Sequence, residues 1–353
     1  MNAPLLSLCM IVKNEAVHLP RCLESVCRVV DEMIIVDTGS TDTTMDIARG
    51  YGAKLFQHAW QDDFALARNI GLERASGDWI LALDADEALD EPSQTQIRFV
   101  ISQTEADGLR LRIRNFTPPG ELQAYEDMVY TRLYRHKPQF RYEQAIHEQI
   151  RTSIERHNGQ IQDTELTILH YGYAQSLAQG GDSRARRNLA ALEKAVANSA
   201  ADPYLYYQLG VTYKSLGNHQ RAYDTLQKAL ELDESILDSG ALDKLNMKLA
   251  QLALAQDNFG QAMHYAQQSL THNPNNLTSL YIIALANMFS GNVQQAYPYF
   301  IRIRRAPNVN PAQLKDLDQA LDYCRRPNLV TLVPKLSLGT RAGLNSHEAW
   351  AQG

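Results

Sequence analysis

The chain has 353 residues, of which 44% are hydrophobic and 21% charged, and its formal net charge is −6. This length exceeds what one ordinary core needs and suggests two domains. The mild acidic balance argues against general nucleic-acid binding, which needs a basic surface. No run approaches the ~20 apolar residues of a membrane span, and the N-terminus lacks the basic region of a signal peptide. We therefore expect a cytoplasmic protein without a transmembrane segment.

The four cysteines are Cys9, Cys22, Cys27 and Cys324, and they form no C-x-x-C pair that would suggest a zinc site. Cys9 falls in an apolar strand-like run and Cys22 on an apolar helix face. We expect both to be small core side chains in a reducing compartment.

Strand-like and helix-like segments alternate in the first half of the chain. Continuous apolar runs predict buried strands over 5–12, 33–36, 54–56 and 79–83. Helical periodicity fills the intervals, with Ser40 expected as the N-cap of the second helix and Asp62 or Asp63 as the N-cap of the third. This alternation predicts an α/β fold with a mostly parallel sheet, which binds ligands at the carboxyl ends of its strands.

Beyond about Gly180 the strand pattern vanishes and a helical repeat replaces it. The small residues Ala222, Ala262 and Ala296 recur at intervals of 40 and 34 residues, and the second interval is the standard period of the tetratricopeptide repeat. The sequence therefore predicts an all-α repeat domain.

We expect a first domain over 1–178, the repeat domain over 183–330 and a C-terminal tail over 331–353. A repeat array presents a concave surface that suits a peptide or protein ligand, or a second copy of the chain in a homodimer. The alternative is that the repeats only buttress the first domain.

Two carboxylates, Asp84 and Asp86, follow the fourth predicted strand and flank Ala85. Strand alternation puts both on one side of the chain, and the small Ala85 keeps the approach open. Carboxylates held this close repel each other unless a cation lies beside them, and oxygen ligands suit Mg²⁺ or Mn²⁺. The alternative is a solvated turn with helix-capping acids, because D-x-D alone is a weak signal.

Other polar residues follow the neighbouring strands. Glu15 comes after the first strand, and Asp37 ends the second, where it could accept from a base N–H or a ribose hydroxyl. Arg68 lies on the helix before the fourth strand and could reach phosphate oxygens or simply lie on the surface. These neighbours favour a site for a nucleotide and a cation over a solvated turn.

In this order the N-terminal motifs resemble family 2 glycosyltransferases, which have the GT-A fold. The resemblance rests on residues 7–15, 37–42, 62–69 and 77–87, and it covers about the first 175 residues. It is strongest to a branch that joins this domain to tetratricopeptide repeats. That branch includes peptide S-glycosyltransferases, and a similar branch adds sugars to the lipopolysaccharide core.

The resemblance implies a UDP-sugar or other nucleoside-diphosphate sugar as donor, with Glu15 and Asp37 at nucleoside-binding positions. It implies that Asp84 is shared with the nucleotide and that Asp86 is the more direct metal ligand. Two later motifs, residues 132–135 and 145–148, resemble signatures of the branch, and the second supplies His147 as a further metal ligand.

Inverting transfer needs a base that takes the acceptor proton, and Glu148 is the candidate. The acidic pair Glu126–Asp127 is the alternative. His170 either approaches the diphosphate or packs at the end of the domain. We expect a peptide or protein acceptor, with a lipopolysaccharide-core saccharide as the enzymatic alternative and a non-catalytic repeat scaffold as the alternative from another class.

Overall fold

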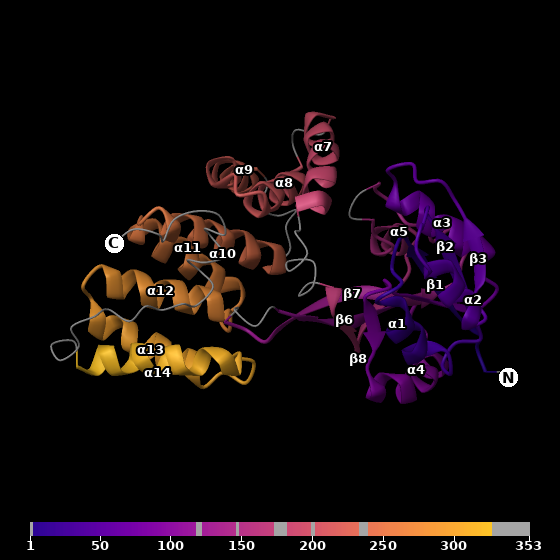
Figure 1. Ribbon diagram of the computed structural model, residues 1–353, viewed down its shortest axis with the longest axis horizontal. Helices are drawn as coiled ribbons and strands as arrows, with labels where there is room; N and C mark the ends of the chain where they lie inside the picture. Colours follow the sequence, from indigo (N-terminus) through magenta and orange to yellow (C-terminus); the bar gives the residue numbers. More distant parts are fainter. Residues whose placement is uncertain are drawn as a thin grey trace. The chain divides into compact units, whose positions relative to one another are not determined.

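The computed structural model describes residues 3–117, 122–145, 148–172, 182–198, 202–232 and 239–326 (Figure 1). The chain divides into two compact units, which are described separately. The first comprises Met1–Phe116 and Glu126–Gln175, and the second comprises Thr117–Tyr125 and Ser176–Gly353. The tail that we expected over 331–353 lies outside the described residues.

The first four strands form the parallel half of the sheet in the first unit. They are β1 (Leu6–Val12), β2 (Glu32–Asp37), β3 (Lys54–Gln57) and β4 (Trp79–Ala82). They pair in the order β3-β2-β1-β4, so that the carboxyl ends of the four strands meet at one edge. The predicted α/β fold with a mostly parallel sheet is confirmed.

Four further strands complete the sheet: β5 (Glu87–Leu89), β6 (Gly108–Phe116), β7 (Tyr125–Arg135) and β8 (Ile161–His170). The order continues from β4 as β7-β6-β8-β5. Strand β7 runs antiparallel to β4, β5 runs antiparallel to β8, and β6 is parallel to β8. The antiparallel β7 therefore brings the second half of the unit to the end of β4.

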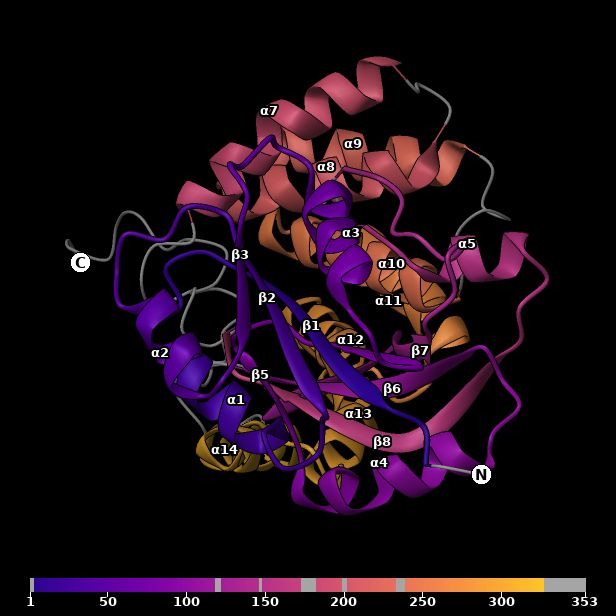
Figure 2. The same ribbon diagram turned by 90° about the vertical axis from the view of Figure 1, so that its right-hand side faces the viewer.

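Helices cover both faces of this sheet, as Figure 2 shows. Alternate side chains of β1 and β2 enter two separate cores. The larger core lies under α1 (Leu19–Val26), α2 (Thr44–Gly50) and α4 (Glu91–Gln103). The smaller core lies under α3 (Phe64–Arg74) and α5 (Arg151–Arg156). This double cover explains the continuous apolar runs of the strands.

Helix starts agree with the sequence at one position and differ at another. Asp63 caps α3, where its carboxylate accepts from the N–H of Leu66 at 2.8 Å. Ser40 does not cap α2, which begins after Thr43. The hydroxyl of Ser40 instead accepts from the N–H of Asn14 at 2.9 Å, and so joins the loops that follow β1 and β2.

The second unit consists of helices in sequential pairs (Figure 1). They are α7 (Asp182–Asn198), α8 (Pro203–Ser215), α9 (His219–Glu231), α10 (Ser239–Ala255), α11 (Phe259–His272), α12 (Leu277–Phe289), α13 (Val293–Arg304), η2 (Pro311–Gln313) and α14 (Leu314–Arg325). The repeating residues Ala222, Ala262 and Ala296 lie on α9, α11 and α13, and all three are fully buried. Small side chains at these positions allow the two helices of each pair to approach closely.

Residues 122–124, which precede β7, pack within this second unit. Leu122 is buried among α10–α14, and its carbonyl oxygen accepts from the N–H of Asn310 at 2.9 Å. Gln123 forms an antiparallel bridge with Val309. Within the described part of the chain, no helix is long and apolar enough to cross a membrane.

Candidate functional site

The turn after β4 carries Asp84, Ala85 and Asp86 at the carboxyl edge of the sheet, and β5 begins immediately behind it at Glu87. Ala85 is only 4% exposed and packs in the larger core. We expected Ala85 to keep the approach to the ligand open. Its side chain is buried in the core instead and anchors the turn there.

Two arginines hold the Asp84 carboxylate. Arg68 donates from Nη2 to Oδ1 at 2.6 Å, and Arg132 donates from Nη2 to Oδ2 at 3.2 Å. Burial alone would raise the pKa of Asp84, but the two guanidinium groups outweigh it and hold this pKa well below its ordinary range. Asp84 is therefore ionised, with both oxygens engaged.

Glu87 lies under the same turn and is only 2% exposed. Its Oε1 accepts from Arg132 Nη2 at 2.8 Å, and its Oε2 accepts from the backbone N–H of Asp84 at 2.9 Å. Burial raises the pKa of Glu87 to about 7, although the charge of Arg132 opposes the shift. From the sequence, Glu87 is expected only as an acid of the alternative solvated turn, and Arg132 only as part of the motif over residues 132–135.

Arg68 joins this turn to the segment before α5. Its side chain is 9% exposed, and its Nε donates to Oε1 of Glu148 at 2.6 Å. Its guanidinium also lies over the ring of Tyr142, 5.5 Å from the ring centre. We expected Arg68 to reach phosphate oxygens or lie on the surface. In the structure it is a buried bridge between Asp84 and Glu148.

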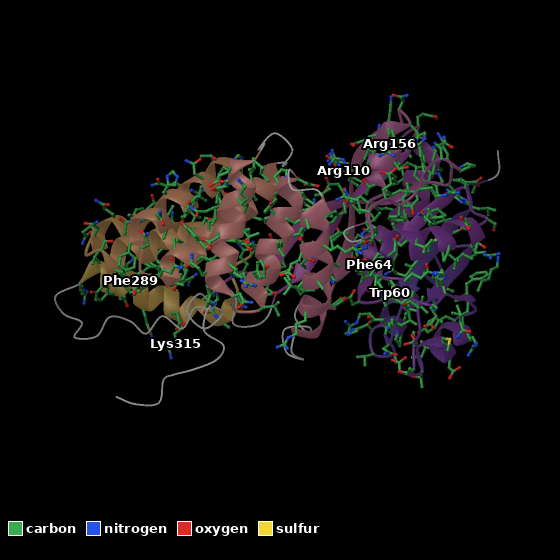
Figure 3. All side chains as sticks on the ribbon, turned by 90° about the horizontal axis from the view of Figure 1, so that it is seen from above. Trp60, Phe64, Arg110, Arg156, Phe289 and Lys315 are labelled. Atoms are coloured by element: carbon green, nitrogen blue, oxygen red, sulfur yellow. The ribbon has the colours of Figure 1, made fainter. Side chains whose placement is uncertain are left out.

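Backbone contacts fasten the same segment to α3. Asn69 and Tyr142 exchange two hydrogen bonds, at 3.0 and 2.9 Å. The N–H of Phe64 donates to the carbonyl oxygen of Ala145 at 2.9 Å. The Phe64 ring packs edge-on against Trp60, with 4.6 Å between ring centres; Figure 3 labels both residues. Glu148 is thus positioned by contacts on both sides of Arg68.

His170 ends β8 beside Asp86, with 3.3 Å between Nε2 and Oδ2. The Asn115 amide nitrogen donates to the carbonyl oxygen of Glu126, which leaves Asn115 Oδ1 as the acceptor for Nδ1–H of His170 at 2.6 Å. Burial by itself would lower the pKa of His170, but the hydrogen bond and charge of Asp86 outweigh it and raise this pKa.

The neutral imidazole would therefore direct the lone pair of Nε2 at a carboxylate oxygen. Two acceptors in contact require either a protonated imidazole or a cation between or beside them. His147, which we expected to be a metal ligand, lies outside the described residues. Among the described residues no three His, Cys, Asp or Glu side chains converge on one point. A cation beside Asp86 and His170 would need further ligands, such as phosphate oxygens.

Asp37 and Glu15 end β2 and follow β1, as the sequence predicted. Asp37 is buried, and its carboxylate accepts from the backbone N–H groups of Gly39 and Ser40, each at 3.1 Å. Gly39 has a φ of 112°, which favours glycine. The N–H of Glu15 donates to Thr44 Oγ1 at 2.7 Å. Asp37 thus shapes its own loop.

Asp127, the alternative base, lies on β7. Both of its carboxylate oxygens accept from Arg114 on β6, at 2.9 and 2.8 Å. Arg112 is 3.9 Å away. The backbone carbonyl oxygen of Glu126 accepts from the Asn115 amide at 3.2 Å, and Asn115 in turn contacts His170.

Comparison with known families agrees with this arrangement. Residues 7–155 match the model of glycosyl transferase family 2, and residues 203–236 match the tetratricopeptide repeat. The first match includes Asp84, Asp86 and Glu148 and ends before His170. The first unit is therefore similar to family 2 of the glycosyltransferases, and the second unit is similar in part to the tetratricopeptide repeat.

Among its relatives, a TPR repeat-containing protein of Synechococcus elongatus is 39% identical over 232 residues, which are 64% of this chain and 56% of that protein. The SPbeta prophage-derived glycosyltransferase SunS of Bacillus subtilis is 24% identical over 73% of this chain and 61% of its own length. The chain thus spans little more than half the length of these curated relatives. This chain also aligns with the crystal structure of S. aureus TarS 1–349 in complex with UDP. The alignment covers 92% of each chain, with 14% sequence identity and a TM-score of 0.39.

Proposed function

We propose that this protein is an inverting glycosyltransferase that moves a sugar from a nucleoside-diphosphate sugar, preferably a UDP-sugar, to a peptide or protein side chain. One observation carries the proposal: a family 2 domain in which Asp86 faces Nε2 of His170 beside a rigidly held Asp84. Ligands commonly bind at the carboxyl edge of such a sheet, where this carboxylate and this imidazole lie.

A divalent cation fits this pair. A hard carboxylate oxygen and an imidazole nitrogen are compatible with Mn²⁺ or Mg²⁺, and Asn115 fixes the tautomer that leaves Nε2 free to act as a ligand. Asp86 and His170 would hold the ion, with His147 as a further candidate. When bound, the ion supplies positive charge against the charge of the departing diphosphate. The geometry thus favours His170 as a ligand, and His147 stays a prediction from the sequence.

The donor would lie along the ends of β1, β2 and β4. Glu15 and the loop that Asp37 shapes provide polar groups for the nucleoside, and Asp84 marks the border with the diphosphate. Arg68 supports this binding through Asp84, because its own guanidinium is engaged by carboxylates.

Glu148 is the proposed base, because Arg68 ties it to the Asp84 turn while only one of its oxygens meets the guanidinium Nε. Asp127 remains the alternative. Replacing Glu148 with Gln should lower kcat by about 100-fold or more with little change in KM for the donor, within the range of general base catalysis. Asp127→Asn is the matched variant, and a larger loss there would exchange the two roles.

The repeat unit supports a macromolecular acceptor, because stacked helical pairs present an extended surface. The same surface would suit a second copy of the chain. A lipopolysaccharide-core saccharide is the second enzymatic candidate, and a scaffold without activity is the third.

The donor site can be tested by thermal stability with UDP or GDP, each with and without Mn²⁺. We expect UDP to raise the melting temperature in a manner that depends on Mn²⁺, and Asp86→Ala to remove that dependence. If neither nucleotide shifts the wild type, the scaffold is favoured and the transferase proposal fails.

The acceptor needs a separate experiment. Labelled nucleotide-sugars are offered with an extract, and mass spectrometry determines whether a peptide or a glycolipid gains the mass of the sugar. A labelled peptide supports the proposal, and a labelled glycolipid replaces it with the saccharide alternative.

A further inference from the structure

A cluster of five ionisable side chains lies at the Asp84 turn. Each of two arginines contacts two carboxylates: Arg68 contacts Asp84 and Glu148, and Arg132 contacts Asp84 and Glu87. Asp84 is the shared member and also the most exposed, with 37% of its side chain accessible. The cluster therefore turns both carboxylate oxygens of Asp84 toward arginines.

Glu87 extends this control to the main chain. Its Oε1 accepts from Arg132, and its Oε2 accepts from the N–H of Asp84, while the N–H of Glu87 donates back to the carbonyl oxygen of Asp84 at 3.0 Å. Both ends of the turn that displays Asp86 are thereby fixed from within the protein. The Asp86 carboxylate itself contacts an imidazole.

We infer that Arg132 and Glu87 are positioning residues: together they hold Asp84 as an internal counter-ion and orient the turn so that Asp86, and not Asp84, contributes the carboxylate for cation binding. The inference rests on the proposed function for its ligand. It gives the two acids of the D-x-D sequence different tasks. A carboxylate shared by two guanidinium groups is a poor ligand for a further cation, because its lone pairs and charge are already engaged.

The first test measures the turn without any ligand. Hydrogen exchange of a peptide spanning residues 80–90 should become at least tenfold faster in Arg132→Met, because Glu87 then loses the partner that orients it toward the Asp84 N–H. Arg132→Lys should give an intermediate rate, since an ammonium group keeps the charge but lacks the fork that reaches two carboxylates. Arg110→Met is the control. Arg110 pairs with Asp163 on the same sheet and is labelled in Figure 3.

The second test measures the cation dependence of UDP binding by thermal stability. We expect Arg132→Met to shift the Mn²⁺ concentration at half-maximal stabilisation by at least fivefold and Arg110→Met to leave it unchanged. Glu87→Gln should act in the same direction as Arg132→Met, because it removes the same orientation of the turn.

The outcomes separate the two hypotheses. If Arg132→Met and Arg132→Lys fold and residues 80–90 exchange hydrogen at the wild-type rate in both, the positioning role is overturned, whatever the metal titration gives. Altered exchange together with an unchanged Mn²⁺ midpoint would also overturn it, because the turn would then move without consequence for the cation. A third outcome is faster hydrogen exchange in the variants without any thermal stabilisation of the wild type by nucleotide or metal. This outcome would refute the proposed function and the role of the turn in cation binding. The role of Asp84 as an internal counter-ion would stand.

Discussion

Gly172 lies against Asp86 so closely that a β-carbon on Gly172 would overlap Oδ2 of the aspartate. The N–H of the preceding residue, Tyr171, donates to the Asp86 carbonyl oxygen at 3.0 Å. Tyr171 is itself held between the guanidinium of Arg21 and the ring of Phe116. The chain after β8 thus closes over the turn after β4, and only glycine allows this approach.

We therefore predict that Gly172→Ala displaces the Asp86 carboxylate from His170. Overpacking of this kind costs about 1–3 kcal/mol of stability. In addition, the Mn²⁺-dependent stabilisation by UDP should be lost or weakened at least tenfold. Gly50→Ala is the control, because a β-carbon there meets nothing within 4 Å. Retention of the full metal response in Gly172→Ala would show that the contact has no functional consequence.

Sequence periodicity predicted the elements that bury their own apolar runs, such as β1 and β4, and the cap that Asp63 provides for α3. These features depend on residues close together in the chain. The contacts of Arg132 with Asp84 and Glu87 escaped prediction because they depend on the antiparallel insertion of β7 beside β4. Arg132 lies 48 residues from Asp84, and nothing local in the sequence specifies that pairing.

The same reason explains the outcome for His170. Sequence reasoning left it between approach to the diphosphate and packing, because its partner Asp86 lies 84 residues away. The spacing of Asp84 and Asp86 indicates a pair of carboxylates, but it does not reveal that Asp84 forms ion pairs with two arginines. Likewise, no pattern around Leu122 indicated that the connection between β6 and β7 packs with repeat helices.

The amino edge of the sheet provides a pH-dependent contribution to stability. Burial by itself would raise the pKa of Glu32, but hydrogen bonds from Lys54, Ser7 and Ser76 outweigh it and lower the pKa to about 2. The hydrogen-bond distances are 2.7 Å to Lys54 Nζ, 2.6 Å to Ser7 Oγ and 2.5 Å to the N–H of Ser76. A pKa below that of the unfolded chain means that the stabilisation is full above about pH 4.5 and disappears as the pH falls toward 2.

Glu32→Gln should therefore lower the free energy of unfolding by about 2 kcal/mol at pH 7, a value discounted because Lys54 is largely exposed. The difference between wild type and variant should shrink as the pH falls below about 4.5. Urea unfolding at several pH values measures it, with the exposed Glu73→Gln as control. A difference that stays constant over this range would exclude the ionised carboxylate as its source.

The close packing of α8 against α9 depends on Gly210 of α8. A β-carbon there would lie 2.6 Å from Cγ of Leu226 on α9. We predict that Gly210→Ala destabilises the second unit by about 1–2 kcal/mol, because overpacking exceeds the gain in helix propensity. Gly260→Ala on α11 meets nothing within 4 Å and should be neutral or stabilising by up to ~1 kcal/mol. Thermal unfolding followed by helix signal distinguishes the two, and equal effects would contradict the packing argument.

Leu122 offers the sharpest test of the connection between β6 and β7. It is 6% exposed within the core of α10–α14, and residues 122–124 pair with residues 308–310. Leu122→Ala should cost about 2–4 kcal/mol, as is usual for a buried leucine. Because this segment belongs to the second unit, hydrogen exchange should accelerate in α12–α14 while β1 and β2 keep their wild-type rates. Leu66→Ala, at an exposed position on α3, should leave α12–α14 unchanged. Faster exchange confined to β6 and β7 would instead mean that the segment stabilises its own strands and contributes nothing to the repeat core.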